Sequence, residues 1–229
     1  MTTDFSTSGK QMQAPSLGDA AYVELKDRLS RGVFHPGDKL TVRSVAEALG
    51  VSSTPARDAI NRLVGDNALV YAGPKTVIIP VLTEADLREI THIRLALEGL
   101  AAELAAEAAT DQVVENLKQI QRSIGEALDR KAYAEALSCN KEFHFLVYRL
   151  SRMPHLVAMI EAQWLRVGPS FYGLYPRFAE ERQGVRNHQM AIEALVEKDR
   201  GALRAAFEND IREGYRQLRS AIRDRAPRL

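Results

Sequence analysis

Two of the five histidines in this sequence fall on apolar faces of predicted helices, where polar side chains are costly unless they are paired. His144 and Asn140 share one apolar stripe. His188 lies on a second stripe and Asp210 on a third. Two imidazoles, a carboxylate and an amide oxygen form a ligand set for Zn, Ni, Mn or Fe, with positions left open for a further ligand. Taken singly, each residue has an alternative: a lone core histidine is usually hydrogen-bonded, and Asp210 could cap a helix or pair with an arginine.

A second set of residues has the chemistry of DNA recognition. Arg43 and Arg57 lie near the starts of two successive predicted helices, and the second helix begins with Ser53 and Thr54. An arginine fork matches O6 and N7 of guanine, whereas hydroxyl groups and the free N–H groups of a helix start bind phosphate oxygens. Lys75, at the tip of a predicted hairpin, would reach the minor groove or its phosphates. Either arginine alone would be interpreted as a solvated surface charge, but the placement of both at helix starts favours DNA binding.

The elements that position these residues form a winged helix-turn-helix over residues 15–80. Gly50 provides the tight connection between the motif's two helices, and Ser53 is the expected N-cap of the second, which enters the major groove. The expected helices cover 17–31, 44–49 and 54–65, and the expected strands cover 68–71 and 76–81. The polar residues 1–14 have no hydrophobic period and are predicted to be a disordered tail.

From Thr83 the strand signals vanish and helical periodicity continues to the C-terminus. Thr83 and Asp86 form a cap pair that opens the first long helix. Six antiparallel helices are expected within residues 81–229, with an interruption at Gly168 and Pro169. The predicted fold is therefore mostly α, with an N-terminal winged helix-turn-helix domain and a C-terminal all-α antiparallel helical bundle.

Composition limits the possible environments. The chain has 31 basic and 30 acidic residues, so any DNA contact must come from local placement of charge. A single cysteine, Cys139, excludes an internal disulfide and fits a reducing compartment. No apolar run approaches the roughly 20 residues of a spanning helix, and the N-terminus has no signal-peptide pattern. We expect a cytoplasmic protein with no membrane partner.

Two motifs give the first half of the chain a resemblance to a known family. The sequence Pro-Gly-Asp-Lys-Leu over 36–40 precedes Leu-Gly-Val-Ser-Ser-Thr-Pro-Ala-Arg over 49–57. This combination resembles the N-terminal domain of the GntR family of bacterial transcription regulators. Through segments 94–98 and 102–106, the helical half resembles the FadR-type effector domain, called FCD. The family usually has arginine where this chain has Ser53, and Arg-Gly where it has Lys75 and Thr76.

The resemblance implies a metal and an effector in the helical half. Metal-binding members of the family that this half resembles carry Asp-x-x-x-His, then Glu-His, and then a final His. His144 and His188 match two of these positions, while Asn140 replaces the Asp and Asp210 replaces the last His. Such a pocket suits a small carboxylate effector, which could chelate the metal and pair with an arginine. The resemblance places Arg94 near this cavity, although Arg94 could instead form a surface pair with Glu98.

Three functions are compatible with these features. The first is a ligand-responsive, DNA-binding transcription regulator, a repressor of a catabolic operon that acts as a homodimer on a double-stranded operator. The second is a metal-dependent enzyme of the helical bundle, which would need a general base beside the metal; the sequence shows no HExxH helix. The third is a constitutive architectural DNA-binding protein, which a net charge of +1 disfavours.

Overall fold

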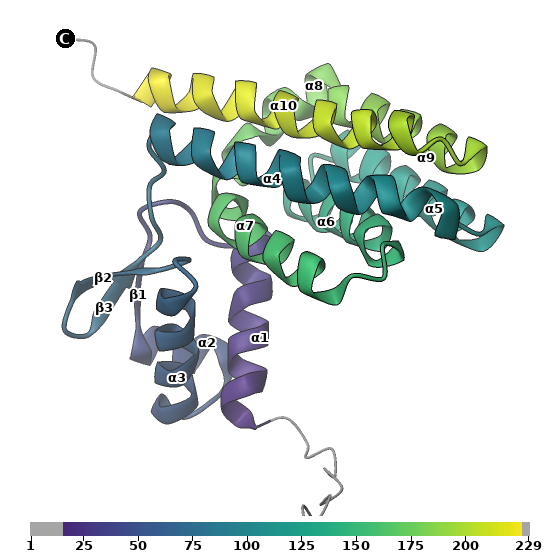
Figure 1. Ribbon diagram of the computed structural model, residues 1–229. Coiled ribbons are helices and arrows are strands. Elements are labelled where there is room, and N and C mark those ends of the chain that lie inside the picture. The colour runs from purple at the N-terminus through teal and green to yellow at the C-terminus, as the bar shows by residue number, and fades with distance from the viewer. Residues whose placement is uncertain (1–15, 226–229) are drawn as a thin grey trace, which may run out of the picture.

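The computed structural model describes residues 16–225, apart from the side chains at positions 172, 175, 176 and 225. The tail expected over residues 1–14 lies outside this range. In these residues a small winged helix-turn-helix unit lies beneath a larger helical bundle (Figure 1). The mostly α fold predicted from the sequence is confirmed.

The winged unit is built from three helices and a three-stranded sheet. Its elements in chain order are α1 (Leu17–Ser30), β1 (Lys39–Thr41), α2 (Val42–Leu49), α3 (Ser53–Gly65), β2 (Val70–Gly73) and β3 (Thr76–Ile78). The strands are antiparallel in the order β1-β3-β2, with Leu40 opposite Val77. The sequence patterns did not predict β1, because its three residues are too few to show an alternation. The α2 helix ends at Gly50, whose φ of 64° lies in the left-handed region. Glycine adopts this conformation without the steric strain that a side chain would introduce.

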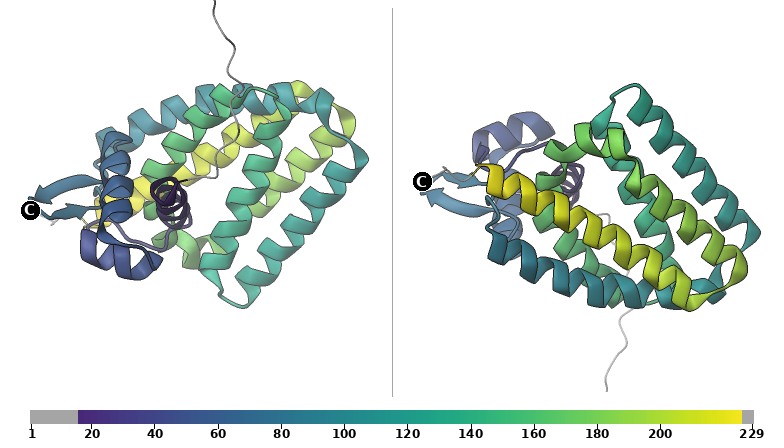
Figure 2. Two further views of the ribbon diagram at one scale, coloured as in Figure 1. Left: turned by 90° about the horizontal axis from the view of Figure 1, so that it is seen from below. Right: turned by 90° about the horizontal axis from the view of Figure 1, so that it is seen from above.

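The bundle comprises six long helices and one short one. They are α4 (Glu84–Ala105), α5 (Asp111–Asp129), α6 (Tyr133–Leu150), α7 (Pro154–Phe171), α8 (Tyr175–Glu181), α9 (Gln183–Glu197) and α10 (Arg200–Arg225). Thr83 and Asp86 form the expected capping box at the start of α4. The α10 helix lies between α4 and α9 and runs antiparallel to α4 (Figure 2). Ion pairs from Arg219 and Arg223 near the end of α10 to Glu84 at the start of α4 fix this direction.

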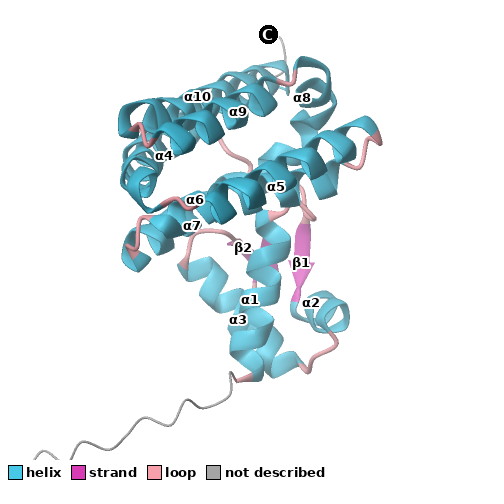
Figure 3. Ribbon diagram, turned by 90° about the vertical axis from the view of Figure 1, so that its right-hand side faces the viewer, coloured by secondary structure: helices cyan, strands magenta, loops and turns pink. Residues whose placement is uncertain are grey.

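The interruption expected at Gly168 and Pro169 does not occur, because α7 continues to Phe171. Tertiary packing on both sides of the helix overrides the low helix propensity of these two residues. A Cβ atom on Gly168 would lie 3.0 Å from the Ser30 backbone oxygen, so glycine permits α1 to approach α7 closely. The winged unit therefore joins the bundle through α1 and α7 (Figure 3).

The hydrophobic residues form two clusters, one in each unit. The bundle cluster begins at Leu82 and includes Phe143, Trp164 and Phe207. The winged cluster extends from Ala21 to Ile79 but also contains Leu165, which belongs to α7. One helix of the bundle thus contributes a core residue to the DNA-binding unit.

Candidate functional site

The first turn of α3 is left open at its N-terminus. Its N-cap is Ser52, not Ser53 as the sequence predicted, and the Ser52 side chain makes no capping hydrogen bond. By contrast, α1, α2 and α4 all begin with capping boxes. Ser53 and Thr54 are exposed in the first turn of α3. The unpaired N–H groups and these hydroxyls together form a site suited to a phosphate oxygen.

The remaining DNA-contact candidates lie around the same helix. Arg57 is exposed on α3 and lines a shallow groove with Lys75 of the wing. The Tyr71 hydroxyl of β2 donates a 2.6 Å hydrogen bond to Oδ1 of Asn61, which fixes the wing against α3. The Arg43 side chain is 89% exposed and pairs with Glu47 at 2.8 Å. Such exposed pairs contribute little stability, so the Arg43 guanidinium can exchange its partner for DNA.

In the bundle, three helices bring together the residues that the sequence predicted as metal ligands. His144 of α6, His188 of α9 and Asp210 of α10 each offer a ligand atom within 4.8 Å of the others. Nε2 of His144 lies 3.2 Å from Nε2 of His188 and 3.3 Å from Oδ2 of Asp210. Both histidines are buried, whereas the Asp210 side chain is 19% exposed.

The outer nitrogen of each imidazole is held by a neighbouring side chain. The Tyr148 hydroxyl donates to Glu98 at 2.5 Å, so it accepts a 2.9 Å hydrogen bond from Nδ1 of His144. Gln121 donates its amide to the Val185 carbonyl, which leaves Oε1 to accept a 2.8 Å bond from Nδ1 of His188. Nε2 of each imidazole is left facing the other imidazole, and Nε2 of His144 also faces Asp210. Outer partners orient metal-binding histidines in the same way.

The surroundings favour the protonation states that a metal requires. Burial and the proximity of His144 lower the pKa of His188 to about 3, so this imidazole is neutral. Burial alone would raise the pKa of Asp210, but its interactions with His144, His188 and Asn187 lower that pKa to about 2. Asn187 adds a 3.4 Å contact from its amide to Oδ1 of Asp210.

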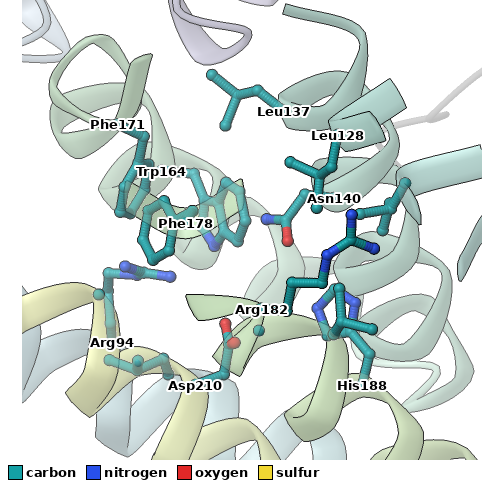
Figure 4. A pocket seen from close by; sticks show the side chains of 15 residues that line it. Arg94, Leu128, Leu137, Asn140, Trp164, Phe171, Phe178, Arg182, His188 and Asp210 are labelled. Atoms are coloured by element: carbon teal, nitrogen blue, oxygen red, sulfur yellow. The ribbon is translucent and has the colours of Figure 1, made fainter. Parts of the chain in front are cut away.

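A pocket with a largely apolar wall opens beside these ligands (Figure 4). Asn140, His188 and Asp210 line one side of the pocket. Trp164, Phe171 and Phe178 lie across the pocket from His188, whereas Leu128 and Leu137 lie beside Asn140. Asn140 thus reaches the cavity, although the close group of three ligand atoms does not include it.

Arg94 also lines this pocket and forms the pair with Glu98 considered from the sequence, but this pair is buried and not on the surface. The residue is only 6% exposed, and its guanidinium binds Glu98 through Nε at 2.6 Å and Nη2 at 3.2 Å. Burial would lower the pKa of Arg94, but the Glu98 carboxylate outweighs it and raises the pKa. The guanidinium carbon lies 5.0 Å from the Trp164 ring centre and 5.7 Å from that of Phe171. Its Nη1 remains for a ligand.

The comparisons with known proteins agree with both halves of this description. Residues 17–75 match the gntR family of bacterial regulatory proteins, and residues 89–213 match the FCD domain. The chain belongs to the GntR family and carries an FCD domain. It is a DNA-binding transcription regulator, which excludes the enzyme considered from the sequence.

Individual relatives support the same assignment. The HTH-type transcriptional regulator McbR of Escherichia coli is 36% identical over 183 residues, covering 79% of this chain and 83% of the relative. The solved structure of E. coli McbR/YncC gives a TM-score of 0.85 at 32% identity, covering 91% of this chain and 99% of that one. A gluconate operon transcriptional repressor of Bacillus licheniformis is 26% identical, covering 83% of this chain and 80% of the relative. Within the described residues, no helix is both long and apolar enough to cross a membrane.

Sequence patterns did not identify the residues that orient the two candidate histidine ligands. Tyr148 follows His144 by one helical turn, a spacing that would have indicated a contact between them. Gln121 lies on a different helix from His188, and Glu98 on a different helix from Tyr148, so no local pattern could pair them.

Proposed function

We propose that this GntR-family regulator is a repressor of a catabolic operon that senses a small carboxylate beside a bound divalent metal. The protein acts in the bacterial cytoplasm as a homodimer, and each protomer contacts one half of a near-palindromic operator. Two half-sites are needed because one recognition helix contacts only a few base pairs. The observation that carries the sensing half is the convergence of His144, His188 and Asp210 at the pocket.

The hydrogen bonds of this group support a metal over a purely structural role. Both imidazoles are oriented through Nδ1, so two Nε2 lone pairs and a carboxylate oxygen meet within 4.8 Å. Such a meeting of acceptors is unfavourable unless a proton or a cation lies between them. Two imidazoles and one carboxylate suit Zn, Ni, Mn or Fe, and Asn140 is a further donor at the pocket. When bound, the cation would supply positive charge and open positions for a carboxylate.

The remaining polar group of the pocket would bind the same carboxylate. Arg94 keeps Nη1 for a ligand while Glu98 occupies its other two nitrogens. In this proposal the carboxylate reaches the metal and Arg94 together, and Arg94 acts as the effector-binding arginine that the family resemblance implies.

Helix α7 is the element through which the pocket would act on DNA binding. Trp164 lines the pocket, and the next residue, Leu165, is buried in the core of the winged unit. Two ion pairs also join α1 to the bundle: Lys26 with Glu161 of α7 at 2.8 Å, and Asp27 with Lys141 of α6 at 3.3 Å. A shift of α7 on ligand binding would therefore move α1, which packs against the recognition helix.

A matched pair of variants on α7 tests this route. Leu165→Ala removes the contact with the winged core, whereas Leu156→Ala removes a bundle contact on the same helix. We expect Leu165→Ala to reduce the effect of metal and carboxylate on operator affinity at least fivefold, and Leu156→Ala to preserve it. If metal and carboxylate changed operator affinity equally in both variants, α7 would be excluded as the route from the pocket to the winged unit.

The function itself is tested with purified protein and promoter DNA taken from beside its own gene. We expect a dimer by analytical ultracentrifugation, a specific shift in gel electrophoresis, and one divalent metal per chain after incubation with Zn²⁺, Ni²⁺ or Mn²⁺. A monomer that binds a half-site tightly would contradict the dimer. Protein that stays metal-free after all three incubations would contradict the metal site while leaving DNA binding intact.

A further inference from the structure

The buried indole nitrogen of Trp164 has no hydrogen-bond partner among the described residues. Trp164 is 1% exposed, and its side chain forms part of the pocket wall. Figure 4 shows the nitrogen of this indole directed into the space between Arg94 and Asn140. A buried N–H group without an acceptor is destabilising, so an acceptor supplied by a ligand would bind it favourably.

The rest of the wall restricts the body of the ligand. Seven apolar or aromatic side chains other than Trp164 line the pocket: Ile124, Leu128, Leu137, Phe171, Phe178, Val185 and Ile211. Aromatic walls favour aromatic ligands, through edge-to-face and offset contacts. The cavity volume is about 60 Å³, which favours a ligand with a single ring over a larger one.

The charges around the pocket limit the ligand to one carboxylate. Arg94 is neutralised by Glu98, and Arg182 at the pocket is paired with Asp129. Asp210 is the remaining acidic residue of the pocket lining. A divalent cation held there would leave a single positive charge uncompensated, which one carboxylate balances. A second carboxylate would lie unpaired against the apolar wall at a large desolvation cost.

From these three observations we infer that the effector is a small aromatic monocarboxylate whose ring carries a hydrogen-bond acceptor for Trp164 Nε1. This inference rests on the proposed carboxylate-sensing function and names its ligand class. The carboxylate lies toward the metal and Nη1 of Arg94, the ring lies between the aromatic side chains, and the acceptor faces the indole. Polyhydroxy acids fit poorly, because their hydroxyl groups would lose water against the apolar wall without gaining partners.

Matched ligands separate the parts of this inference. We would titrate Zn²⁺-loaded protein by calorimetry with 3- and 4-methoxybenzoate, 3- and 4-ethylbenzoate, terephthalate, lactate and gluconate. The methoxy and ethyl compounds have the same shape and differ in one acceptor oxygen. We expect both benzoate series to bind at least tenfold more tightly than lactate, gluconate or terephthalate. One methoxy isomer should exceed its ethyl counterpart by about three- to tenfold, the effect of one hydrogen bond.

Trp164→Phe keeps an aromatic wall but removes the donor, so it should abolish the methoxy preference and preserve ethylbenzoate affinity. The chain has a single tryptophan, so a ¹⁵N-labelled sample gives one indole N–H resonance. That resonance should shift downfield with the preferred methoxybenzoate and much less with its ethyl counterpart, which tests the contact in the wild-type protein.

The outcomes distinguish this inference from the proposed function. Tighter binding of lactate or gluconate would overturn the aromatic ligand class and leave carboxylate sensing intact. A methoxy preference that persists in Trp164→Phe, or an indole resonance that responds equally to both ligands, would overturn the role of Trp164. Failure of every carboxylate to bind the Zn²⁺-loaded protein would contradict the proposed function itself.

Discussion

Replacing Tyr148 with phenylalanine removes one hydroxyl from the outer shell of the proposed metal site. That hydroxyl accepts from Nδ1 of His144 at 2.9 Å and donates to Glu98 at 2.5 Å. In Tyr148→Phe, Nδ1 of His144 loses its buried partner, while Glu98 keeps both bonds from Arg94. Outer-shell substitutions of this kind typically lower metal affinity by about 10–100-fold. This corresponds to about 1.4–2.7 kcal/mol.

The same substitution has a second, independent effect. The orphaned Nδ1–H group of His144 should lower the free energy of unfolding of the metal-free protein by about 1–3 kcal/mol. The winged unit has its own core, so operator affinity without metal should stay within about twofold of the wild-type value. Both effects follow from one hydroxyl, which makes the prediction specific.

Zinc competition with a chromophoric chelator would measure metal affinity, and urea unfolding in the presence of a chelator would measure stability. Tyr22→Phe is the matched control, because the Tyr22 hydroxyl donates a comparable 2.7 Å bond to Asp66 in the winged unit. The control should leave zinc affinity unchanged. Wild-type zinc affinity in Tyr148→Phe would refute the view that Tyr148 sets the His144 tautomer for metal binding.

Four further variants address other parts of the chain. Arg57→Ala should abolish the sequence preference at one base pair per half-site and weaken binding to the preferred base by about 1–3 kcal/mol. Lys75→Ala should instead weaken binding to all DNA sequences evenly and flatten its salt dependence. Fluorescence anisotropy on mutated operators separates the two effects, and a uniform loss in Arg57→Ala would make Arg57 a phosphate contact. Elemental analysis should find no bound metal in the double variant His144→Ala/His188→Ala, which should bind the operator normally but no longer respond to effector. Effector-induced release of DNA by this variant would place the sensor elsewhere. Gly50→Ala should destabilise the winged unit by about 1–2 kcal/mol in denaturant unfolding, because the φ of 64° is strained in alanine while no atom lies within 4 Å of the added Cβ; unchanged stability would contradict that account.

Most of the architecture could be predicted from the sequence, because helical periodicity and cap signals are local. The Thr83–Asp86 box marked the start of α4 correctly. The errors arose where local signals were ambiguous or overridden. Two adjacent serines could each cap α3, and the structure uses Ser52. Gly168 and Pro169 ordinarily end a helix, but α7 continues through them because it packs on both the bundle and α1.

The candidate site could be predicted in part from the sequence, for the same reason. His144, His188 and Asp210 stood out because each is polar on an otherwise apolar stripe, and the structure brings them together. Their metal-binding role stays a prediction. The pairing of Glu98 with Tyr148 depends on contacts between separate helices, and no periodicity within one helix encodes such a contact.

The buried polar network explains why a metal site and a ligand pocket would respond as one unit. It runs from the Arg94 guanidinium over the Trp164 ring, through Glu98 and Tyr148, to Nδ1 of His144. Well-packed apolar residues would often stabilise a fold as well as such buried charges, so stability alone does not account for the network. Because Glu98 accepts from both Tyr148 and Arg94, a cation beside His144 alters the carboxylate that holds Arg94 over Trp164. A metal would therefore act on the same arginine and indole that the proposed effector contacts. By reciprocity, the effector would change metal affinity by the same factor.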